Sequence, residues 1–479
     1  MKVRLVLLAW VISWGLIGCE ERKVNEAQSG SETTSPSTAS IVRTDTLEAR
    51  ISEGEQTLLD PEPNIQKQTA NAAYEYGDYQ KAESQWEASL QLQRNDPETL
   101  IYLNNARIGN DPAYSIAVPV PIDAEINVAK EILRGAAQAQ QEINTNGGVK
   151  GKPIKIAIAN DGNNPNLAQQ LAHAFNQNSE ILGVIGHFSS DVTLEAAQVY
   201  QSEGLVAISP TSSSTAISNV GSYVFRTVSS DCFAGNALVE YSVNQLRVNQ
   251  AAIIYNSTSS YSTSLRDVFK SSLEKQGGTV VAEFNFSQPN FDIVSVLTEL
   301  KQKGAKAIVL FPNSSGINAL ETLDKTYLIA LINRGELPLL GGDSLYKPRT
   351  LQLGQENVVN MVVSVPWHTK NTNTQFATTA KQLWGGDVNW RTVLTYDATM
   401  ALAKAIETNP TREGIQQTLL SPEFEAQGAS APIKFLPTGD RAAEVELVKI
   451  VAGNSSGFGY DFVPINNSLQ PTVGVCRSN

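Results

Sequence analysis

The sequence contains few of the residues that carry most enzyme and metal chemistry. Its 479 residues include only three histidines and three cysteines. It has no Gly-x-Gly-x-x-Gly fingerprint, no Walker loop and no His-Glu-x-x-His pair, which excludes these nucleotide-binding and zinc-protease motifs. The positive charge needed for non-specific nucleic-acid binding is also missing, because the net charge is -12. We therefore expect no catalytic residue, no metal, no cofactor and no nucleic-acid partner.

A serine hydrolase is the one enzyme class for which the sequence offers candidate residues. His187 stands three residues before Ser190, and a catalytic triad is assembled by geometry rather than by chain order. The only Gly-x-Ser-x-Gly match spans 453–457. A nucleophile elbow requires a helix after the match, and the "FGYDFVP" that follows it at 458–464 is not helical in pattern. We interpret this match as a loop and His187 as a packed or hydrogen-bonded loop residue.

The N-terminus has the pattern of an export signal. Lys2 and Arg4 precede an apolar run over 5–18, which is too short to span a bilayer but fits a signal-peptide core. The run ends in "LIGC", which resembles the lipobox of bacterial lipoproteins. The resemblance implies a signal peptide over 1–19, lipidation of Cys19 and a periplasmic protein anchored to a bacterial membrane by acyl chains. An ordinary signal peptide with a chance cysteine is the alternative.

The next 90 residues divide into a linker and a helical segment. Residues 20–63 are mostly polar and predict a flexible linker. Residues 64–110 predict helices, with Ala82, Trp86 and Leu90 at helical spacing. The stretch "YGDYQKAESQWEASL" resembles a tetratricopeptide repeat, and "DPETLIYLNNAR" resembles the first helix of a second one. An ordinary helical hairpin is the alternative.

From residue 113 the chain alternates between short apolar strands and helices. Strands are predicted at "YSIAVPV", "IKIAIA", "ILGVIG" and "LVAI", and a second series begins at "AAIIY". Such alternation is typical of parallel sheets covered by helices on both faces. The two series indicate two α/β lobes, with the ligand in a cleft between them.

Hydroxyl-bearing loops follow two neighbouring strands of the first lobe. "GHFSSD" follows one strand and "SPTSSS" follows the next. Strands in a parallel sheet deliver such loops to one edge, where helix N-termini present free N–H groups. The two loops therefore predict a cradle for a carboxylate. Cys232 and Cys476 are a possible disulfide in an exported protein, and the sequence leaves their pairing open.

Two longer stretches carry a family resemblance. "INTNGGVKGKPIKIAIANDGNNP" and "GVIGHFSSDVTLEAAQVYQSEGLVAISPTSSS" resemble the type I periplasmic binding proteins for branched-chain (Leu/Ile/Val-type) amino acids. The resemblance covers about 113–465 and implies a two-lobed α/β binding domain over 113–470 whose lobes are joined by three crossovers. Lobe 1 is expected at about 113–228 and 367–430, and lobe 2 at about 229–366 and 431–470.

The resemblance also implies the ligand-binding residues. Ser190, Thr211 and Ser213 match the positions that hold the ligand's α-carboxylate, Tyr261 the position of a packing tyrosine, and Asp343 the acidic position that takes the ammonium. The alternatives are that Ser190 and Asp343 only cap helices and that Tyr261 is a surface loop residue.

Three other positions depart from the family pattern. Asn313 and Val128 stand near positions where aromatic residues are common, and Asp191 stands where a small hydroxyl residue is common. These departures leave the fold expectation intact and weaken the identity of the ligand.

Two functions are consistent with the sequence. The first is a lipid-anchored solute-binding protein that captures a neutral, branched-chain-type amino acid or a small amide and delivers it to an ABC permease. The second is an envelope regulatory or scaffolding lipoprotein, for example one that activates a peptidoglycan synthase. Helical repeats in front of this fold favour the second, since they provide a surface for a protein partner.

Overall fold

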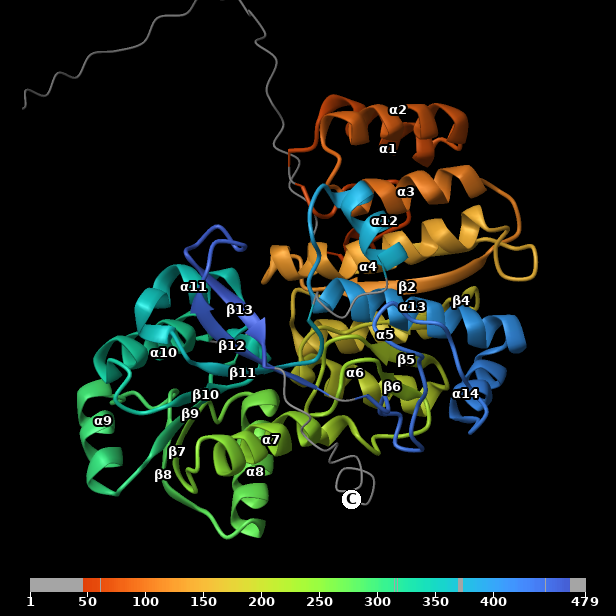
Figure 1. Cartoon of the computed structure of the whole chain (residues 1–479). Coiled ribbons are helices and arrows are strands. Elements are labelled where there is room, and N and C mark those ends of the chain that lie inside the picture. Colours follow the sequence, from red (N-terminus) through yellow and green to blue (C-terminus); the bar gives the residue numbers. More distant parts are fainter. Residues whose placement is uncertain are drawn as a thin grey trace, which may run out of the picture. The chain divides into compact units, whose positions relative to one another are not determined.

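The computed structural model describes residues 46–60, 62–313, 315–316, 318–368, 374–443 and 445–465 (Figure 1). The predicted signal peptide with Cys19 and most of the predicted linker lie outside these residues. Cys232 is disulfide-bonded, and its predicted partner Cys476 lies outside the described residues, so that pairing stays a prediction. No helix within the described ranges is long and apolar enough to cross a membrane.

Lobe 1 is built on a six-stranded sheet with the order β1-β3-β2-β4-β5-β6. Its strands are β1 (Ile51–Ser52), β2 (Tyr114–Val120), β3 (Ile154–Asn160), β4 (Ile181–Ile185), β5 (Val206–Ser209) and β6 (Val224–Arg226). Strands β2 to β6 run parallel, and the edge strand β1 is antiparallel to β3. The strands are apolar along nearly their whole length because helices cover both faces, as the sequence predicted.

Among the described residues after 113, six helices complete lobe 1. They are α4 (Ile126–Thr145), α5 (Pro165–Gln177), α6 (Ser190–Glu203), α12 (Thr374–Trp384), α13 (Trp390–Thr408) and α14 (Arg412–Leu420). Buried residues of α4 and α13 share one core with alternate residues of β2 and β3, and those of α5 and α6 pack on the opposite face. Gly135 lets α4 approach α13 closely, since a Cβ there would lie 2.2 Å from the carbonyl oxygen of Thr392.

Lobe 2 has a seven-stranded sheet with the order β13-β12-β11-β10-β9-β7-β8. Its elements are α7 (Asp231–Glu240), β7 (Gln250–Tyr255), α8 (Ser260–Lys275), β8 (Thr279–Asn285), α9 (Ile293–Gln302), β9 (Ala307–Phe311), α10 (Ala319–Asn333), β10 (Leu339–Gly341), α11 (Pro348–Gly354), β11 (Val362–Val365), β12 (Glu446–Ala452) and β13 (Tyr460–Pro464). Strands β7 to β11 are parallel, and β12 and β13 extend the sheet antiparallel. The two predicted α/β lobes are confirmed.

The segment at 453–459 is a hairpin turn between β12 and β13. Asp461 accepts hydrogen bonds from the backbone N–H groups of Ser455 (3.1 Å) and Ser456 (2.7 Å). The loop interpretation of the Gly-x-Ser-x-Gly match is therefore confirmed for 453–457. Residues 460–464 pair with β12 as a strand, so the residues after the match are not helical, as the sequence predicted.

The predicted return of the chain to lobe 2 at residue 431 is wrong by about 14 residues. Residues 426–441 form bridges among themselves and with Arg226 at the end of β6. The buried Arg226 donates to Asp440 Oδ1 at 2.7 Å, and Phe435 packs edge-on against Phe225. This segment stays on lobe 1 because it pairs a buried charge and covers apolar rings there. The chain joins the lobe 2 sheet at β12.

Three helices precede lobe 1, as the sequence predicted for 64–110. They are α1 (Ile65–Glu75), α2 (Tyr79–Leu92) and α3 (Pro97–Ile108). Trp86 is fully buried between the rings of Tyr74 and Tyr102. Helix α3 is buried on nearly every side, between α2 and α4, so the core of these helices is continuous with that of lobe 1 (Figure 1). The segment is thus an extension of lobe 1, and its identity as a tetratricopeptide repeat stays a prediction.

The same extension closes the outer edge of β3. Ser52 of β1 pairs with Ile158, and Asn144 of α4 exchanges hydrogen bonds with Ile154. Between them, Asn105 of α3 donates to the carbonyl of Ile156 at 2.8 Å and accepts from its N–H at 3.2 Å. An open strand edge is a template for unwanted pairing, and here side-chain amides complete it. The predicted flexible linker over 20–63 is wrong for 46–60, since these residues are ordered by this pairing.

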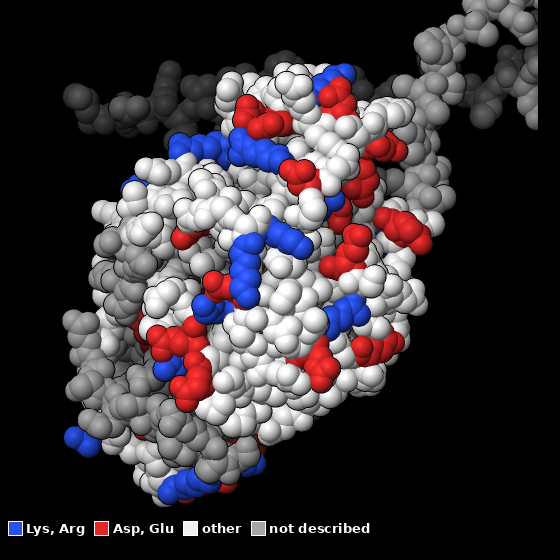
Figure 2. Space-filling model, turned by 90° about the vertical axis from the view of Figure 1, so that its right-hand side faces the viewer, with Lys and Arg blue, Asp and Glu red and all other residues white. Residues whose placement is uncertain are grey.

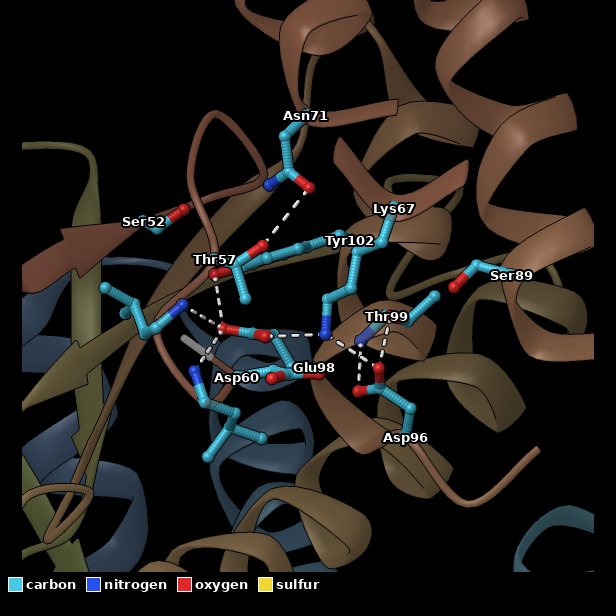
Figure 3. A network of polar contacts seen from close by, with 12 residues as sticks. Ser52, Thr57, Asp60, Lys67, Asn71, Ser89, Asp96, Glu98, Thr99 and Tyr102 are labelled. Carbon is cyan, nitrogen blue, oxygen red and sulfur yellow. Dashed lines mark hydrogen bonds and ion pairs between the residues drawn. The ribbon is translucent and has the colours of Figure 1, made fainter. Parts of the chain in front are cut away.

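A buried ionic network holds the loop at 52–60 against the helices (Figure 3). The ammonium of Lys67 lies 2.7 Å from Asp96 Oδ2 and 2.8 Å from Glu98 Oε2. Glu98 Oε1 in turn accepts from the N–H groups of Leu58 (2.6 Å) and Leu59 (3.1 Å). Burial would lower the pKa of Lys67, but the two carboxylates raise it, so the ammonium stays charged.

Candidate ligand-binding site

The two predicted hydroxyl loops meet at the carboxyl ends of β4 and β5. The Thr211 hydroxyl donates to the carbonyl of Phe188 at 2.7 Å, and the Ser209 hydroxyl donates to the carbonyl of His187 at 2.8 Å. Residues 187–189 therefore have a fixed backbone that leads into helix α6. The free N–H groups at the start of this helix carry partial positive charge, which suits an anionic group.

Two adjacent serines at this helix start have different roles. Ser190 Oγ accepts a hydrogen bond from the N–H of Ser214 at 3.2 Å, so this hydroxyl joins the two loops. Ser189 occupies the N-cap position and makes no side-chain cap bond. Its buried Oγ has no hydrogen-bond partner within the described residues. Ser189 is thus the hydroxyl that is available to a ligand.

The lobe 2 side of the site is formed by the start of α8 and the end of β10. The Tyr261 hydroxyl donates to Asp343 Oδ1 at 2.9 Å and accepts from the N–H of Ser344 at 3.2 Å. Gly342 permits this approach, since a Cβ there would lie 2.4 Å from the Tyr261 hydroxyl. Burial raises the pKa of Asp343, and burial together with the Asp343 charge raises the pKa of Tyr261. A cationic ligand group would relieve the cost of burying this carboxylate.

A cavity of about 20 Å³ lies between these two sides. Lobe 1 contributes Phe188, Ser189, Ser190, Asp191, Thr211, Trp390 and Arg391, and lobe 2 contributes Ser259, Tyr261, Ser315 and Asp343. This volume holds about one water molecule and is smaller than an amino acid.

Direct hydrogen bonds join the lobes beside the cavity. Asp191 Oδ1 accepts from the N–H of Ser260 at 2.9 Å, so a carboxylate of lobe 1 sits at the N-terminus of helix α8 in lobe 2. The N–H of Thr215 donates to Ser264 Oγ at 2.9 Å. Asp191 was noted in the sequence only as a departure from the family pattern. In the structure it joins the two lobes through its bond to Ser260.

Comparison with known proteins identifies the fold. A model of a periplasmic binding protein family matches residues 123–454. The chain belongs to this family. Among curated proteins, this periplasmic binding protein is 30% identical over 186 residues to an amino acid binding protein of Pseudomonas aeruginosa, covering 39% of this chain and 50% of that one. It is 30% identical over 201 residues to Leu/Ile/Val-binding protein homolog 1 of Brucella abortus, covering 41% and 53%. The chain thus spans about half the length of the curated relatives it matches.

Solved structures show the same two-lobed α/β architecture. An ABC transporter substrate-binding protein from Desulfitobacterium hafniense, in complex with Leu, has a TM-score of 0.62 at 24% identity, covering 74% of this chain and all of that one. A leucine binding protein from Thermotoga maritima has a TM-score of 0.62 at 21% identity, covering 74% and 99%. A protein from Rhodopseudomonas palustris in complex with 3,4-dihydroxy benzoic acid also has a TM-score of 0.62, at 15% identity, covering 74% and 96%. These identities establish the type I periplasmic binding fold, and the bound molecules differ between the structures.

Four of the five predicted ligand-binding residues line the cavity of this periplasmic binding protein. They are Ser190, Thr211, Tyr261 and Asp343. Ser213 does not line it. Its carbonyl accepts from the N–H of Asp231 at 2.8 Å, and its hydroxyl bonds the Asp231 carboxyl behind the site.

The structure also places the residues for which helix capping or surface exposure was the alternative. The cap before Asp343 is Gly342, and Tyr261 lies on helix α8 rather than in a surface loop. Ser190 is the first residue of α6, and the cap position belongs to Ser189.

Sequence reasoning missed Trp390 and Arg391 at the start of α13. The polar side chain of Arg391 is only 4% exposed, although it lies at the cavity. No motif marks this pair, because α13 reaches the cleft from a part of the chain that is about 180 residues beyond the hydroxyl loops. Only the crossover of the chain back to lobe 1 brings it there.

His187 cannot act as a base for a nearby serine. Its Nδ1 lies 2.7 Å from Asp161 Oδ2 and its Nε2 lies 2.9 Å from the Tyr200 hydroxyl. The imidazole is fully buried, and both ring nitrogens are occupied. The interpretation of His187 as a hydrogen-bonded loop residue is confirmed.

Charged residues outside the site form no single-sign stripe on the face shown in Figure 2, where acidic and basic side chains are scattered among uncharged ones. A stripe of basic side chains would be the footprint of a nucleic-acid partner.

Proposed function

We propose that this protein is the solute-binding component of an ABC importer and that it captures an amino acid between its two lobes. The observation that carries the proposal is the polar cavity, where a helix start with an unpartnered hydroxyl faces a buried carboxylate. A zwitterion has the complementary pair of charges. The protein is a carrier in this proposal, and it delivers the ligand unchanged to a membrane permease.

The ligand's two charged groups have separate places. Its α-carboxylate would lie at the start of α6, where it accepts from backbone N–H groups and from the hydroxyls of Ser189 and Thr211. Its ammonium would pair with Asp343, whose second hydrogen-bonding partner is Tyr261. Ser190 and Ser213 would position the site without being its main ligand contacts. Ser190 joins the two loops, and Ser213 holds the start of helix α7.

Capture requires the lobes to open and close. The cavity of about 20 Å³ is too small for an amino acid to enter, so the contacts of Asp191 with Ser260 and of Thr215 with Ser264 must break on opening. Ligand contacts from both lobes would favour the closed state, because each lobe alone offers only one half of the zwitterion site. In this proposal the permease recognises the closed, ligand-bound arrangement of the lobes.

The family resemblance favours a neutral, branched-chain-type amino acid or a small amide as the ligand. The names of the relatives from Brucella abortus and Thermotoga maritima refer to such amino acids. Lipidation of Cys19 would hold the protein at the membrane on the periplasmic side, close to its permease. The fold family and the predicted signal peptide support this location.

A regulatory or scaffolding lipoprotein is the second candidate. Helices α1 and α2 expose the large apolar side chains of Ile65 (66%), Tyr76 (87%) and Leu92 (68%), which a protein partner could cover. This function does not need a zwitterion site. A protein with an intact site and an accessory surface can also combine both roles, so ligand binding is the property that separates the candidates.

Calorimetric titration with a panel of the twenty amino acids tests the proposal. We expect at least one to bind, and we expect its analogue without the amino group, the 2-oxo acid, to bind at least about 30-fold more weakly because Asp343 loses its partner. If no amino acid binds at millimolar concentration, the transport proposal fails and the scaffolding candidate takes its place.

A further inference from the structure

Arg391 is a buried cation that the proposed zwitterion site leaves without a partner. It lines the cavity and is 96% buried, as its exposed fraction of 4% gives. Its Nε has no hydrogen-bond partner, and none of the ion pairs in the part of the chain that the structure describes includes it. Its guanidinium instead stacks 4.3 Å from the ring centre of Trp390 and 5.9 Å from that of Phe188. A buried guanidinium nitrogen without an acceptor is costly, so this site favours a ligand that supplies one.

The compensating charge for Arg391 comes mainly from Asp343. Burial lowers the pKa of Arg391, and the Asp343 carboxylate opposes this more than Glu131 and Glu125 do. An ammonium bound to Asp343 would neutralise that carboxylate and place a second cation near Arg391. A neutral zwitterion therefore worsens the electrostatics around the guanidinium unless the ligand itself brings another anion.

The lining of the cavity gives an independent indication. Its described residues are hydroxyl-bearing, charged or aromatic, and none of them is aliphatic. Of the three aromatic residues in the lining, Phe188 and Trp390 have the Arg391 guanidinium over their rings, and Tyr261 presents its hydroxyl to Asp343. A branched apolar side chain gains from contact with apolar walls, and this cavity offers few. The polar lining suits a polar or charged ligand side chain.

We infer that Arg391 binds a second carboxylate of the ligand, which makes the ligand an acidic amino acid rather than a neutral one. The inference rests on the proposed capture of an amino acid between the lobes, and it replaces the neutral ligand that the family resemblance favours with an acidic one. The α-carboxylate lies at the start of α6, the ammonium at Asp343, and the side-chain carboxylate at Arg391, whose guanidinium carbon lies 4.3 Å from the ring centre of Trp390. Arg391 can then form a bidentate pair, and each buried charge in the closed cleft has a partner.

The test compares glutamate with glutamine and aspartate with asparagine, because each pair differs in charge with little change in shape. Calorimetric titrations are made with the full-length protein, with Arg391→Gln and with Arg349→Gln. Arg349 is a matched control, since it is ion-paired with Asp324 on the surface of lobe 2 and does not line the cavity.

We expect the wild-type protein to bind one acidic amino acid at least about 30-fold more tightly than its amide, since removing one partner of a buried charge pair costs about that factor or more. Arg391→Gln should reduce that preference to within a few-fold. Arg349→Gln should keep it. If Arg391→Gln does not fold, the comparison of acid and amide in the wild-type protein still tests the inference, because it needs no variant. Arg391→Lys, which keeps the charge but not the planar fork, then serves as the variant.

Three results would overturn the inference. Tighter binding of leucine or glutamine than of either acidic amino acid would refute it while leaving the proposed function in place. Equal weakening of an acid and its amide in Arg391→Gln would assign Arg391 to the α-carboxylate instead. Absence of binding by any amino acid would refute both the inference and the proposed function.

Discussion

Replacement of Asn105 by alanine tests whether the N-terminal helices are part of lobe 1. Asn105 is fully buried and uses its whole hydrogen-bonding capacity. It donates to the carbonyls of Glu53 and Ile156 and accepts from the N–H of Ile156 and from Gln140 Nε2. Alanine would remove the side-chain partner of the Glu53 carbonyl and of both backbone groups of Ile156, while Gln140 Nε2 would keep its bond to the Ile154 carbonyl.

The expected loss follows from the buried groups that are left. An unsatisfied buried donor or acceptor costs roughly 1–3 kcal/mol, and water that enters the gap recovers part of it. We therefore expect Asn105→Ala to lower the free energy of unfolding by about 3 kcal/mol or more. Because α3 and the lobe 1 sheet share a core, the loss should appear in a single transition monitored on both parts.

The assay is urea unfolding followed by circular dichroism, together with hydrogen exchange. In the variant, the amide of Ile156 should exchange faster than in wild type, since its acceptor is gone. Asn166→Ala is the control, because Asn166 is exposed on α5 of the same lobe and should change stability by less than about 0.5 kcal/mol. An Asn105→Ala loss no larger than the control, or separate unfolding of the helices and lobe 1, would refute the shared edge.

Three further predictions concern other parts of the chain. Trp86→Ala should cost roughly 3–5 kcal/mol and should destabilise lobe 1 along with α1 to α3, and an unchanged melting of residues 113–465 would contradict this. Burial raises the pKa of Asp231 from 3.8 to about 7, so the folded state binds a proton there more tightly than the unfolded state does. The resulting stabilisation is complete below about pH 4 and is lost as the pH rises through 7. Asp231→Asn should then have a free energy of unfolding up to about 4 kcal/mol higher than wild type at pH 8 and equal to wild type at pH 4. Urea unfolding at both pH values measures this, and the same difference at pH 4 and pH 8 would contradict the prediction. Cys19→Ala should abolish incorporation of labelled fatty acid, and label in that variant would contradict lipidation at this residue.

Much of the fold could be predicted from the sequence. The strand at 114–120 is predicted to the residue, and most of the other predicted helices and strands after residue 113 agree with the structure within a few residues. The agreement arises because buried parallel strands need continuous apolar runs, and the covering helices need a clear apolar face. The short strand β1 was missed, since two residues in a polar stretch carry no periodic signal. Its formation depends on β3, about 100 residues away.

The site was predictable where its residues follow strand ends and less so elsewhere. The strand-end argument predicted that the loops with Ser190 and Thr211 meet at one edge of the sheet, whereas Tyr261 and Asp343 were predicted only from the family resemblance. All four residues line the cavity. Arg391 was missed because it starts a helix that reaches the same cavity only through the last part of lobe 1. Ser189 was not separated from Ser190, since the difference depends on which hydroxyl is taken by Ser214.

The most direct test of the central claim is titration of Asp343→Asn with the amino acid that binds wild type best. Asparagine keeps the shape of the side chain and removes the charge that the ligand's ammonium needs. The expected loss is on the order of 2–5 kcal/mol, or about 30-fold to several thousand-fold in affinity, while the surface control Asp324→Asn keeps wild-type affinity. Wild-type affinity in Asp343→Asn would show that the ligand does not bind between the lobes in the way proposed.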